Sequence, residues 1–349
     1  MSEARLRPLA LDEREAVLAL LDGWPLPDRW RGRDFFRRYV ERDPTFRDDN
    51  VWVAEQDGAL VACVQIFPRR LRVRGAAVPT GGIGSVFTSE RARGGGLASA
   101  LLEAAVAAMR ARGMTLSLLF AARHAFYGRL GWTLWPRPRP LWLRGDASRT
   151  PDRARPEPFD PARDLEAVMA LHARYAAPLD GTVVRDRAFW EGQLHFAGNP
   201  EEDFLLARDA AGRVEAYARG CVEGGLYHVS ELGRTGDASG AAAAADLVAA
   251  LLAPRDPDPL AARLERGSGE LRRVAVAPPL DDRALDAALA ERGIGAKLFE
   301  ERATMLRVLD RAALATQIGV AAREGESDAD YLARLLPPER FVFFAADRF

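Results

Sequence analysis

The chain has few of the residues that hold metal ions or form disulfide bonds. Only two cysteines, Cys63 and Cys221, occur among its 349 residues, and no CxxC motif links them. Cysteines this sparse build neither a disulfide framework nor a structural zinc site. The four histidines show no spacing typical of metal ligands, so we expect no bound metal.

An excess of one charge and a long apolar run are also missing. The formal net charge is -1, which excludes the basic field that attracts nucleic acid or an anionic membrane. The most apolar helical run, residues 241–253, is too short to span a bilayer. The first six residues contain no apolar signal-peptide core. We therefore expect a cytoplasmic protein with neither nucleic acid nor membrane as a partner.

The order of the expected elements indicates a duplicated fold. A chain of 349 residues is long enough for two domains of roughly 150 residues each. Strands and helices follow one another in a similar order in residues 1–145 and in residues 153–309. At the junction of the units, residues 146–158 are rich in Pro, Arg and Asp, which predicts a linker.

Each unit is expected to end on a strand of its own. We predict that a strand over residues 133–144 closes the first unit and that a strand over residues 303–309 closes the second. Residues 310–349 form a short terminal segment. It contains a helix near residues 328–336 and ends in a strand-like apolar stretch over residues 340–349.

Residues 84–102 are the most informative segment, with a strand, an Arg/Gly turn and the start of a helix. Glycines let the backbone N–H groups of such a turn point at one spot, and the helix N-terminus adds partial positive charge. The turn therefore predicts a cradle for a pyrophosphate. The pattern R-x-x-G-x-[GA] fits Arg93, Gly96 and Ala98, and it also fits residues 91–96. We prefer the first register because a helix then begins at Leu97.

This segment resembles the acetyl-CoA signature of the GCN5-related N-acetyltransferases, the GNAT superfamily. It is not a Rossmann fingerprint, because no G-x-G-x-x-G stands in the turn with an acidic residue about 20 positions further on. The resemblance implies acetyl-CoA as co-substrate, with the backbone of a splayed strand pairing with its pantetheine arm. The residues expected to bind the cofactor are Val86, Phe87, Thr88, Arg91, Arg93, Gly94, Gly95, Gly96, Leu97 and Ala98.

A second segment, residues 126–132, follows an apolar strand and resembles the family's Y-x-x-x-G-[FYW] pattern. Amine attack on a thioester releases a thiolate, whose conjugate acid has a pKa of about 8.5. A tyrosine hydroxyl within hydrogen-bond reach of the sulfur can supply that proton. We therefore expect Tyr127 to act as the general acid. The alternative is that Tyr127 is an ordinary half-buried aromatic residue.

The chain as a whole resembles the enhanced intracellular survival (Eis) type acetyltransferases. The stretches that carry this resemblance are residues 78–86, 126–132, 231–232, 305–310 and 347–349. It implies an α+β protein with two tandem GNAT folds, whose mixed and mostly antiparallel sheets are flanked by helices. It also implies that the terminal carboxylate, here that of Phe349, reaches the N-terminal active site as general base. Family members form hexamers, so a homo-oligomer is expected.

The sequence departs from the Eis pattern after Asp310. Only 39 residues remain (349 minus 310), too few for the family's sterol-carrier-like third domain, so we expect a short tail in its place. The carboxylate of Phe349 could orient the acceptor ammonium electrostatically instead of taking its proton, and a merely structural tail is a further alternative. In the second unit, residues 231–239 carry no cofactor pattern and Asp237 would repel a pyrophosphate, so we expect no coenzyme there.

The acceptor is expected to be a small-molecule or peptide amine. Such an amine is a cation at neutral pH, so its pocket should carry acidic or aromatic groups. The candidates near the expected mouth are Asp22, Trp24, Trp30, Phe36 and His124. The resemblance suggests an aminoglycoside, a polyamine or a lysine-like amine, acetylated by direct attack in a ternary complex. A non-catalytic coenzyme A sensor or scaffold and a protein-lysine acetyltransferase are the alternatives.

Overall fold

Two seven-stranded sheets form the framework of the protein in a computed structural model, which describes residues 3–26, 31–145, 156–196 and 202–349. The first sheet has the order β1-β2-β3-β4-β5-β14-β6 and the second the order β13-β7-β12-β11-β10-β9-β8. Within the sheets, β4–β5 and β11–β12 pair in parallel, and the other pairs are antiparallel. This confirms the expected α+β fold with two mixed, mostly antiparallel sheets.

In the first sheet the strands are short at the edges and long in the middle. In the first sheet they are β1 (Arg5–Pro8), β2 (Val51–Gln56), β3 (Ala59–Val73), β4 (Ala76–Thr88), β5 (Leu116–Phe120), β6 (Thr133–Leu134) and β14 (Thr304–Val308). In the second sheet they are β7 (Arg137–Arg144), β8 (Glu157–Pro158), β9 (Asp203–Arg208), β10 (Val214–Glu223), β11 (Leu226–Arg234), β12 (Val274–Val276) and β13 (Ile294–Glu301).

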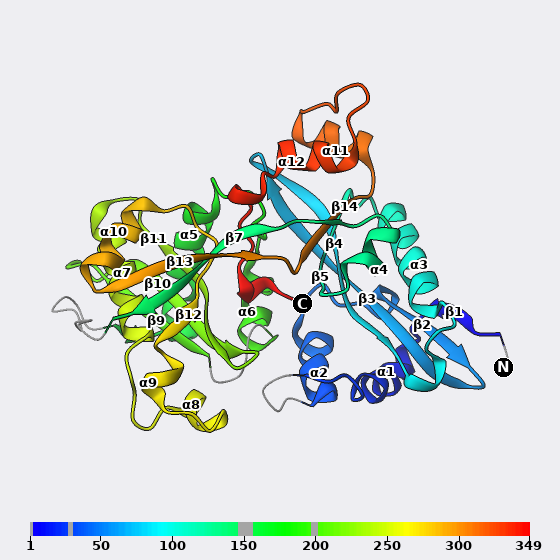
Figure 1. The fold of residues 1–349 in the computed structure, drawn as a ribbon, viewed down its shortest axis with the longest axis horizontal. Helices are drawn as coiled ribbons and strands as arrows, with labels where there is room; N and C mark the ends of the chain where they lie inside the picture. The colour runs from blue at the N-terminus through cyan, green and yellow to red at the C-terminus, as the bar shows by residue number, and fades with distance from the viewer. Residues whose placement is uncertain (1–2, 27–30, 146–155, 197–201) are drawn as a thin grey trace.

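Helices cover both faces of each sheet. The first half holds α1 (Arg14–Leu21), α2 (Gly32–Arg42), α3 (Leu97–Ala111) and α4 (His124–Arg129). The second half holds α5 (Pro161–Ala176), α6 (Arg187–Phe196), α7 (Ala238–Leu251), α8 (Pro259–Arg263), α9 (Ser268–Leu271) and α10 (Arg283–Glu291). The C-terminal segment holds α11 (Arg311–Ile318) and α12 (Asp328–Leu335). Figure 1 shows the two halves side by side, with α11 and α12 above the first.

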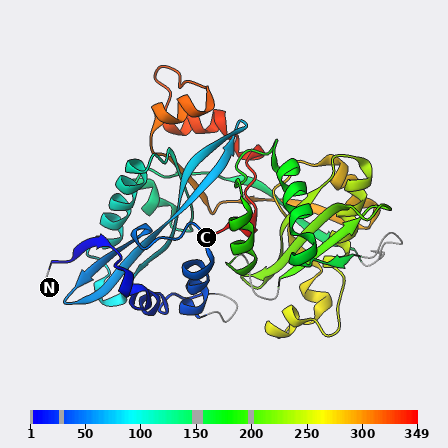
Figure 2. The same cartoon turned by 180° about the vertical axis from the view of Figure 1, so that it is seen from behind.

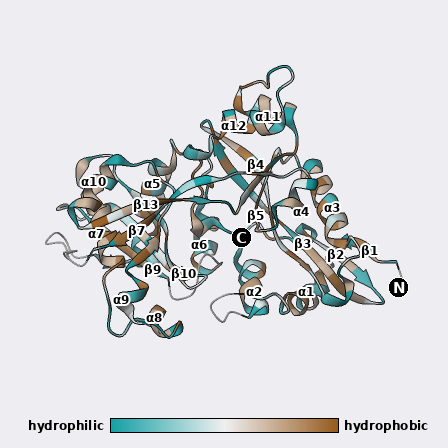
Figure 3. Cartoon of the chain, viewed as in Figure 1, coloured by the Kyte–Doolittle hydropathy of each residue, from teal (hydrophilic) through white to brown (hydrophobic). Residues whose placement is uncertain are grey.

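Alternation along the strands explains why both faces need cover. Successive side chains of a strand point to opposite faces. Accordingly, Val53 packs into the core beneath α1 and α2, whereas its neighbour Ala54 packs into the core beneath α3. The same holds in the second half, where Tyr217 faces α5 and Ala216 faces α7. In Figure 3, α1 and α3 carry both hydrophobic and hydrophilic stretches, as expected of helices that bury one face.

The two halves exchange strands, so the expectation that residues 133–144 close the first unit is confirmed for β6 at the sheet edge but wrong for residues 137–144. β7 joins the second sheet, where it lies between β12 and β13. In return β14, expected at the end of the second unit, enters the first sheet between β5 and β6. Figure 1 shows both crossing segments between the halves. Periodicity predicts that a strand exists but does not say which sheet edge it pairs with.

The C-terminal segment is wrapped into the seam between the halves. Residues 310–349 are all described, and they contain α11, α12 and two 3₁₀ turns, Pro338–Arg340 and Ala345–Asp347, but no strand. The strand expected over residues 340–349 is therefore wrong, because residues 341–344 pair with no strand and Ala345–Asp347 form a 3₁₀ turn. It is nevertheless buried, and Phe343 is only 1% exposed. Figures 1 and 2 both show the C-terminus between the halves.

Specific contacts hold this segment against both halves. The indole Nε1 of Trp135, which follows β6, donates a hydrogen bond to the Leu336 carbonyl at 3.0 Å. The backbone N–H of Val342 donates to the Asp180 carbonyl at 2.8 Å. Gly181 has φ +91°, and a Cβ there would lie 2.6 Å from the Phe341 ring, so glycine allows the tail to approach closely. In the part of the chain that is described, no helix is long and apolar enough to cross a membrane.

The strand exchange makes the halves interdependent, and this can be tested by dividing the chain. We expect residues 1–145 expressed alone to show no cooperative thermal unfolding. This fragment lacks β14, which covers the edges of β5 and β6, and it leaves β7 without partners. The full chain should unfold in one transition when followed by circular dichroism. A cooperative, native-like melt of the fragment would contradict the interdependence.

Candidate functional site

The central feature of the first sheet is the point where two parallel strands part. β4 and β5 pair from Thr80 opposite Leu116 to Ile83 opposite Leu119. Beyond Ile83, β4 continues to Thr88 in contact with β3 alone, so among the described residues its other edge has no strand partner. The backbone groups along this edge are available to a ligand, because an unpaired strand edge presents free donors and acceptors.

A β-bulge causes the parting. The register of β3 against β4 shifts between Cys63 and Gln65, and Ser85 adopts φ +51°, which is uncommon for a residue other than glycine. Two buried contacts hold this conformation. The Ser85 Oγ donates to Gln65 Oε1 at 3.2 Å, and the Cys63 Sγ donates to the Ser85 carbonyl at 3.3 Å. Bulges of this kind redirect a strand and are frequent beside active sites.

The Arg/Gly turn follows β4 directly and leads into α3. Gly94 and Gly96 have φ +84° and +76°, and a Cβ at either would meet no atom within 4 Å. The first backbone hydrogen bond of α3 is donated by Ala100 to the Gly96 carbonyl at 3.1 Å. The N–H groups of Leu97 and Ala98 therefore have no acceptor inside the helix. An exposed, open turn at a helix N-terminus fits a pyrophosphate.

The side chain of Arg93 is exposed and bends back over the turn. Its Nε donates to the Thr88 carbonyl at 3.3 Å, and its Nη1 lies 3.4 Å from Glu90 Oε1. Arg91 is exposed as well, and Val86, Phe87 and Thr88 are half-buried. The expected cofactor residues thus form one continuous stretch, from the unpaired edge of β4 to the first turn of α3.

The corresponding place in the second half is already filled by the protein. Asp237 is the N-cap of α7, and its carboxylate accepts hydrogen bonds from the Gly240 N–H at 2.8 Å and from the Thr235 hydroxyl at 2.9 Å. A carboxylate at this helix end takes the position that an anion would need.

Tyr127 lies on α4, the short helix after β5. Its ring is half-buried and packs edge-on against Phe126 at 4.9 Å and Trp132 at 6.2 Å. Together with Val86 and Leu97 it borders the apolar core beneath α3. Burial raises the pKa of the Tyr127 phenol above its usual value of 10.0, so the hydroxyl stays protonated at neutral pH.

The C-terminal residue lies where β4 and β5 part. The Phe349 ring stacks on Phe67 with centroids 4.9 Å apart and lies 5.7 Å from the ring of Phe120, the last residue of β5. A Cβ at Gly82 would fall 2.3 Å from the Phe349 ring, and one at Gly84 would fall 3.4 Å from its carbonyl oxygen. Glycines in β4 therefore make room for the chain end, and the terminal carboxyl group lies beside the opening.

The residues expected to bind the acceptor have mixed placements. Asp22 accepts hydrogen bonds from Arg31 Nη2 at 3.0 Å and from the Arg33 N–H at 3.2 Å, so its carboxylate is occupied by the start of α2. Phe36 is buried, and Trp24 lies between it and Phe87, with centroids 5.5 and 6.0 Å away. Trp24 therefore stands beside the expected cofactor strand.

Two further acceptor candidates have different outcomes. Trp30 lies outside the described residues. His124 begins α4, three residues before Tyr127, and is half-buried. Among the described residues its Nε2 has no hydrogen-bond partner.

Residues near the chain end that the sequence did not single out bring charge to the opening. Arg348 Nη1 donates to Glu223 Oε1 at 2.6 Å, and its guanidinium lies 5.1 Å from the Phe120 ring. The Tyr39 hydroxyl donates to the Arg348 carbonyl at 3.4 Å. The sequence signal for this role was the charged pair Asp347-Arg348 at the end of an apolar tail. That signal does not reveal that Arg348 pairs with Glu223, more than 100 positions away.

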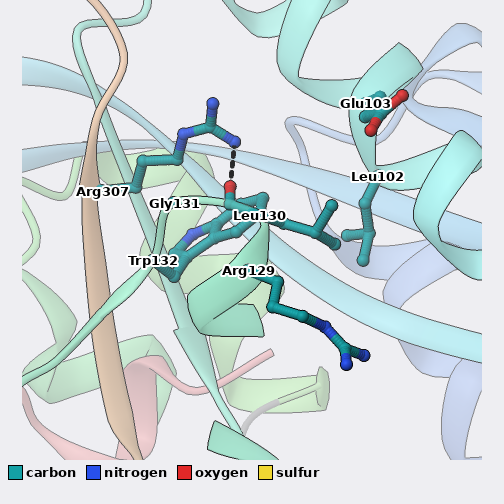
Figure 4. Close-up of a pocket in the computed structure, with 7 residues that line it drawn as sticks. All are labelled: Leu102, Glu103, Arg129, Leu130, Gly131, Trp132 and Arg307. Carbon is teal, nitrogen blue, oxygen red and sulfur yellow. Dashed lines mark hydrogen bonds between the residues drawn. The ribbon is translucent and has the colours of Figure 1, made fainter. Parts of the chain in front are cut away.

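A cavity of about 330 Å³ lies between α3 and the residues that follow α4 (Figure 4). Its lining residues are Leu102, Glu103, Arg129, Leu130, Gly131, Trp132 and Arg307. Arg307, from the exchanged strand β14, donates to the Leu130 carbonyl at 2.5 Å, and its guanidinium lies 5.0 Å from the Trp132 ring. Within the described ranges, no group of three or more His, Cys, Asp or Glu side chains could hold a metal ion.

Comparison with known proteins finds acetyltransferases that resemble parts of the chain. Residues 5–135 match the family model described as acetyltransferase (GNAT) domain. Over 180 residues the chain is 31% identical to an uncharacterized N-acetyltransferase of Streptomyces avermitilis. This alignment covers 46% of this chain and 42% of that protein. The match thus spans less than half the length of the relative.

Solved structures resemble the chain over most of its length. A protein of unknown function from Enterococcus faecalis V583, described as a probable N-acyltransferase, aligns with a TM-score of 0.65 at 16% identity, covering 90% of this chain and 75% of that one. Eis1 from Mycobacterium abscessus aligns with a TM-score of 0.56 at 18% identity, covering 90% and 76%. At these identities the likeness concerns the fold.

Proposed function

We propose that this chain, which contains a GNAT acetyltransferase domain, transfers the acetyl group of acetyl-CoA to a primary amine. The observation that carries the proposal is one continuous surface. It combines the unpaired edge of β4, the open glycine turn and the free N-terminus of α3. The chain end beside the same opening supports an arrangement of the Eis type with a shortened C-terminal segment.

Acetyl-CoA would be held mainly by backbone groups. The N–H groups of Gly94 to Ala98 would receive the pyrophosphate, because the turn is open and the helix dipole favours an anion there. The edge of β4 at Val86 to Thr88 would pair with the pantetheine arm, as another strand would. When bound, acetyl-CoA supplies an activated thioester, and the residues of the chain orient it and manage the protons.

Tyr127 and Phe349 are assigned the two proton transfers. The amine nitrogen bonds to the acetyl carbon, and the carbon–sulfur bond breaks. The Tyr127 hydroxyl donates its proton to the departing sulfur, and its raised pKa keeps that proton available at neutral pH. The Phe349 carboxylate receives the proton that the amine loses. An α-carboxyl group has a reference pKa of about 3.3–3.7, so it also stabilises the ammonium electrostatically.

The first experiment measures thiol release from acetyl-CoA with a panel of amines. The panel contains aminoglycosides, polyamines, lysine and a lysine-containing peptide, and the protein carries no tag at its C-terminus. We expect turnover with one class, which would name the acceptor. Tight acetyl-CoA binding without turnover on any amine would contradict the catalytic proposal and favour a coenzyme A sensor.

Replacing the proposed acid tests its role. We expect Tyr127→Phe to lower kcat by about 10²-fold or more, because the substitution removes only the hydroxyl that donates the proton. Phe126→Leu is the packing control, because it changes the ring that packs against Tyr127 and leaves the Tyr127 hydroxyl in place. The KM for acetyl-CoA should change little. Turnover of Tyr127→Phe near the wild-type value would remove Tyr127 from the mechanism.

Extending the chain tests the terminal carboxylate. Two glycines added after Phe349 move the charge away from the opening while leaving every side chain unchanged. We expect kcat to fall by about 10²-fold, because misplacing a reacting group by even an ångström carries a penalty of that order. The same two glycines added before Met1 provide the control. A fully active C-terminal extension would show that the free carboxylate at position 349 is dispensable.

A further inference from the structure

A buried polar cluster lies between the two halves and takes no part in the proton transfers described above. Its centre is Arg185, which has no exposed side-chain surface. Its Nε donates to Asp347 Oδ1 at 2.9 Å and its Nη2 to Asp347 Oδ2 at 2.7 Å. Its Nη1 and Nη2 donate to the two Glu231 oxygens at 3.0 and 2.7 Å. Both carboxylates are also fully buried.

Further contacts complete the cluster. Gln193 Nε2 donates to Asp347 Oδ1 at 2.9 Å and to the Ala346 carbonyl at 3.1 Å, so the turn before the chain end is held at two atoms. The Tyr217 hydroxyl donates to Glu231 Oε1 at 2.6 Å. The Arg185 guanidinium lies 4.6 Å from the Trp190 ring. Every oxygen of the two carboxylates thus has a donor.

Arg185 connects three separate parts of the chain. It follows a stretch that pairs with β3 of the first sheet, where the Val184 N–H donates to the Arg70 carbonyl at 2.8 Å. Glu231 lies on β11 of the second sheet, and Asp347 lies in the tail. The guanidinium therefore fixes the tail relative to both sheets at once.

The buried charges of this cluster hold the tail in a single position. A buried carboxylate is stable only with a paired charge and satisfied hydrogen bonds. Arg185 holds the pKa of Glu231 well below its usual range, so that carboxylate stays charged. If Asp347 moved away, the guanidinium would keep one carboxylate and lose two charge-assisted hydrogen bonds. The tail is thereby fixed at Asp347, which lies two residues before the chain end.

We propose that Arg185 is a positioning residue for acetyl transfer: it clamps Asp347 and so holds the Phe349 carboxylate at the opening between β4 and β5. The proposal rests on the proposed function. Without the clamp, the chain end would keep the Gln193 and Arg348 contacts but lose its paired charge-assisted hydrogen bonds, and a chain end that is tied down less firmly frays more readily. The stacking of Phe349 on Phe67 would remain, but it fixes the ring and leaves the carboxylate free to rotate.

Asp347→Asn tests the clamp with the smallest change of shape. The amide keeps the volume but replaces one acceptor oxygen with a donor that faces a guanidinium. We expect kcat to fall by at least about tenfold, since a displaced group at the reacting centre is costly. The KM for acetyl-CoA should stay within about twofold, because the turn at Gly94–Gly96 is untouched. Arg185→Lys should lower kcat in the same way.

Asp258→Asn provides the matched control. Asp258 pairs with Arg272 at 2.5 Å, and the two side chains are 1% and 0% exposed. This pair lies near α8 and α9, which Figures 1 and 2 show at the end of the second half away from the C-terminus. Both Asn variants should lower the melting temperature, but Asp258→Asn should keep kcat within about twofold of the wild type.

Release of Phe349 by a carboxypeptidase provides a readout that needs no acetyltransferase activity. With the clamp intact the chain end is held, so release should be slow. Asp347→Asn should release Phe349 at least about tenfold faster than Asp258→Asn. Each variant is assayed the same number of degrees below its own melting temperature. Faster release without turnover on any amine would support the clamp and overturn only the proposed function. Equal release from the two variants, or unchanged kcat in Asp347→Asn, would overturn the proposal.

Discussion

The bidentate contact between Arg185 and Asp347 is the interaction on which the arrangement of the site depends. It joins the chain end to a segment that is itself paired with β3, and Glu231 shares the same guanidinium from the second sheet. A buried guanidinium with two carboxylates is costly unless every partner is present. The three parts of the chain therefore assemble together, and the position of the terminal carboxylate is set by groups in both halves.

The exchanged strands place the tail where this contact can form. Because β14 pairs in the first sheet, the terminal segment starts beside the first half. From there it runs through the seam between the two halves to its last residue, Phe349. Apolar side chains such as Phe341 and Phe343 fill the seam along this path. Burial on this scale supplies most of the stability of the arrangement, and the polar contacts select its register. The path explains how residues 310–349 reach the opening.

Local features of the fold could be predicted from the sequence, and long-range ones could not. The glycine turn and the start of α3 at Leu97 depend on neighbouring residues, and spacing reveals them. The exchange of β7 and β14 depends on which sheet edges are free, and no local pattern records that. Asp22 was an acceptor candidate because a pocket for an amine cation should carry acidic groups, but its carboxylate is occupied by Arg31 and Arg33.

The second sheet repeats the parting of strands seen in the first, and the tail occupies it. Pairing of β11 with β12 ends at His228, and the register of β10 against β11 shifts just beyond, where Arg219 lies opposite Glu231. This matches β4, whose pairing with β5 ends at Ile83 just before its own bulge. In the first half the freed edge faces an open glycine turn, whereas in the second half Glu231 turns toward Arg185 and the Ala345–Asp347 turn packs on β11. One opening thus keeps a free strand edge, and the other anchors the tail. Since only one residue separates Asp347 from Phe349, filling the second opening fixes the chain end at the first.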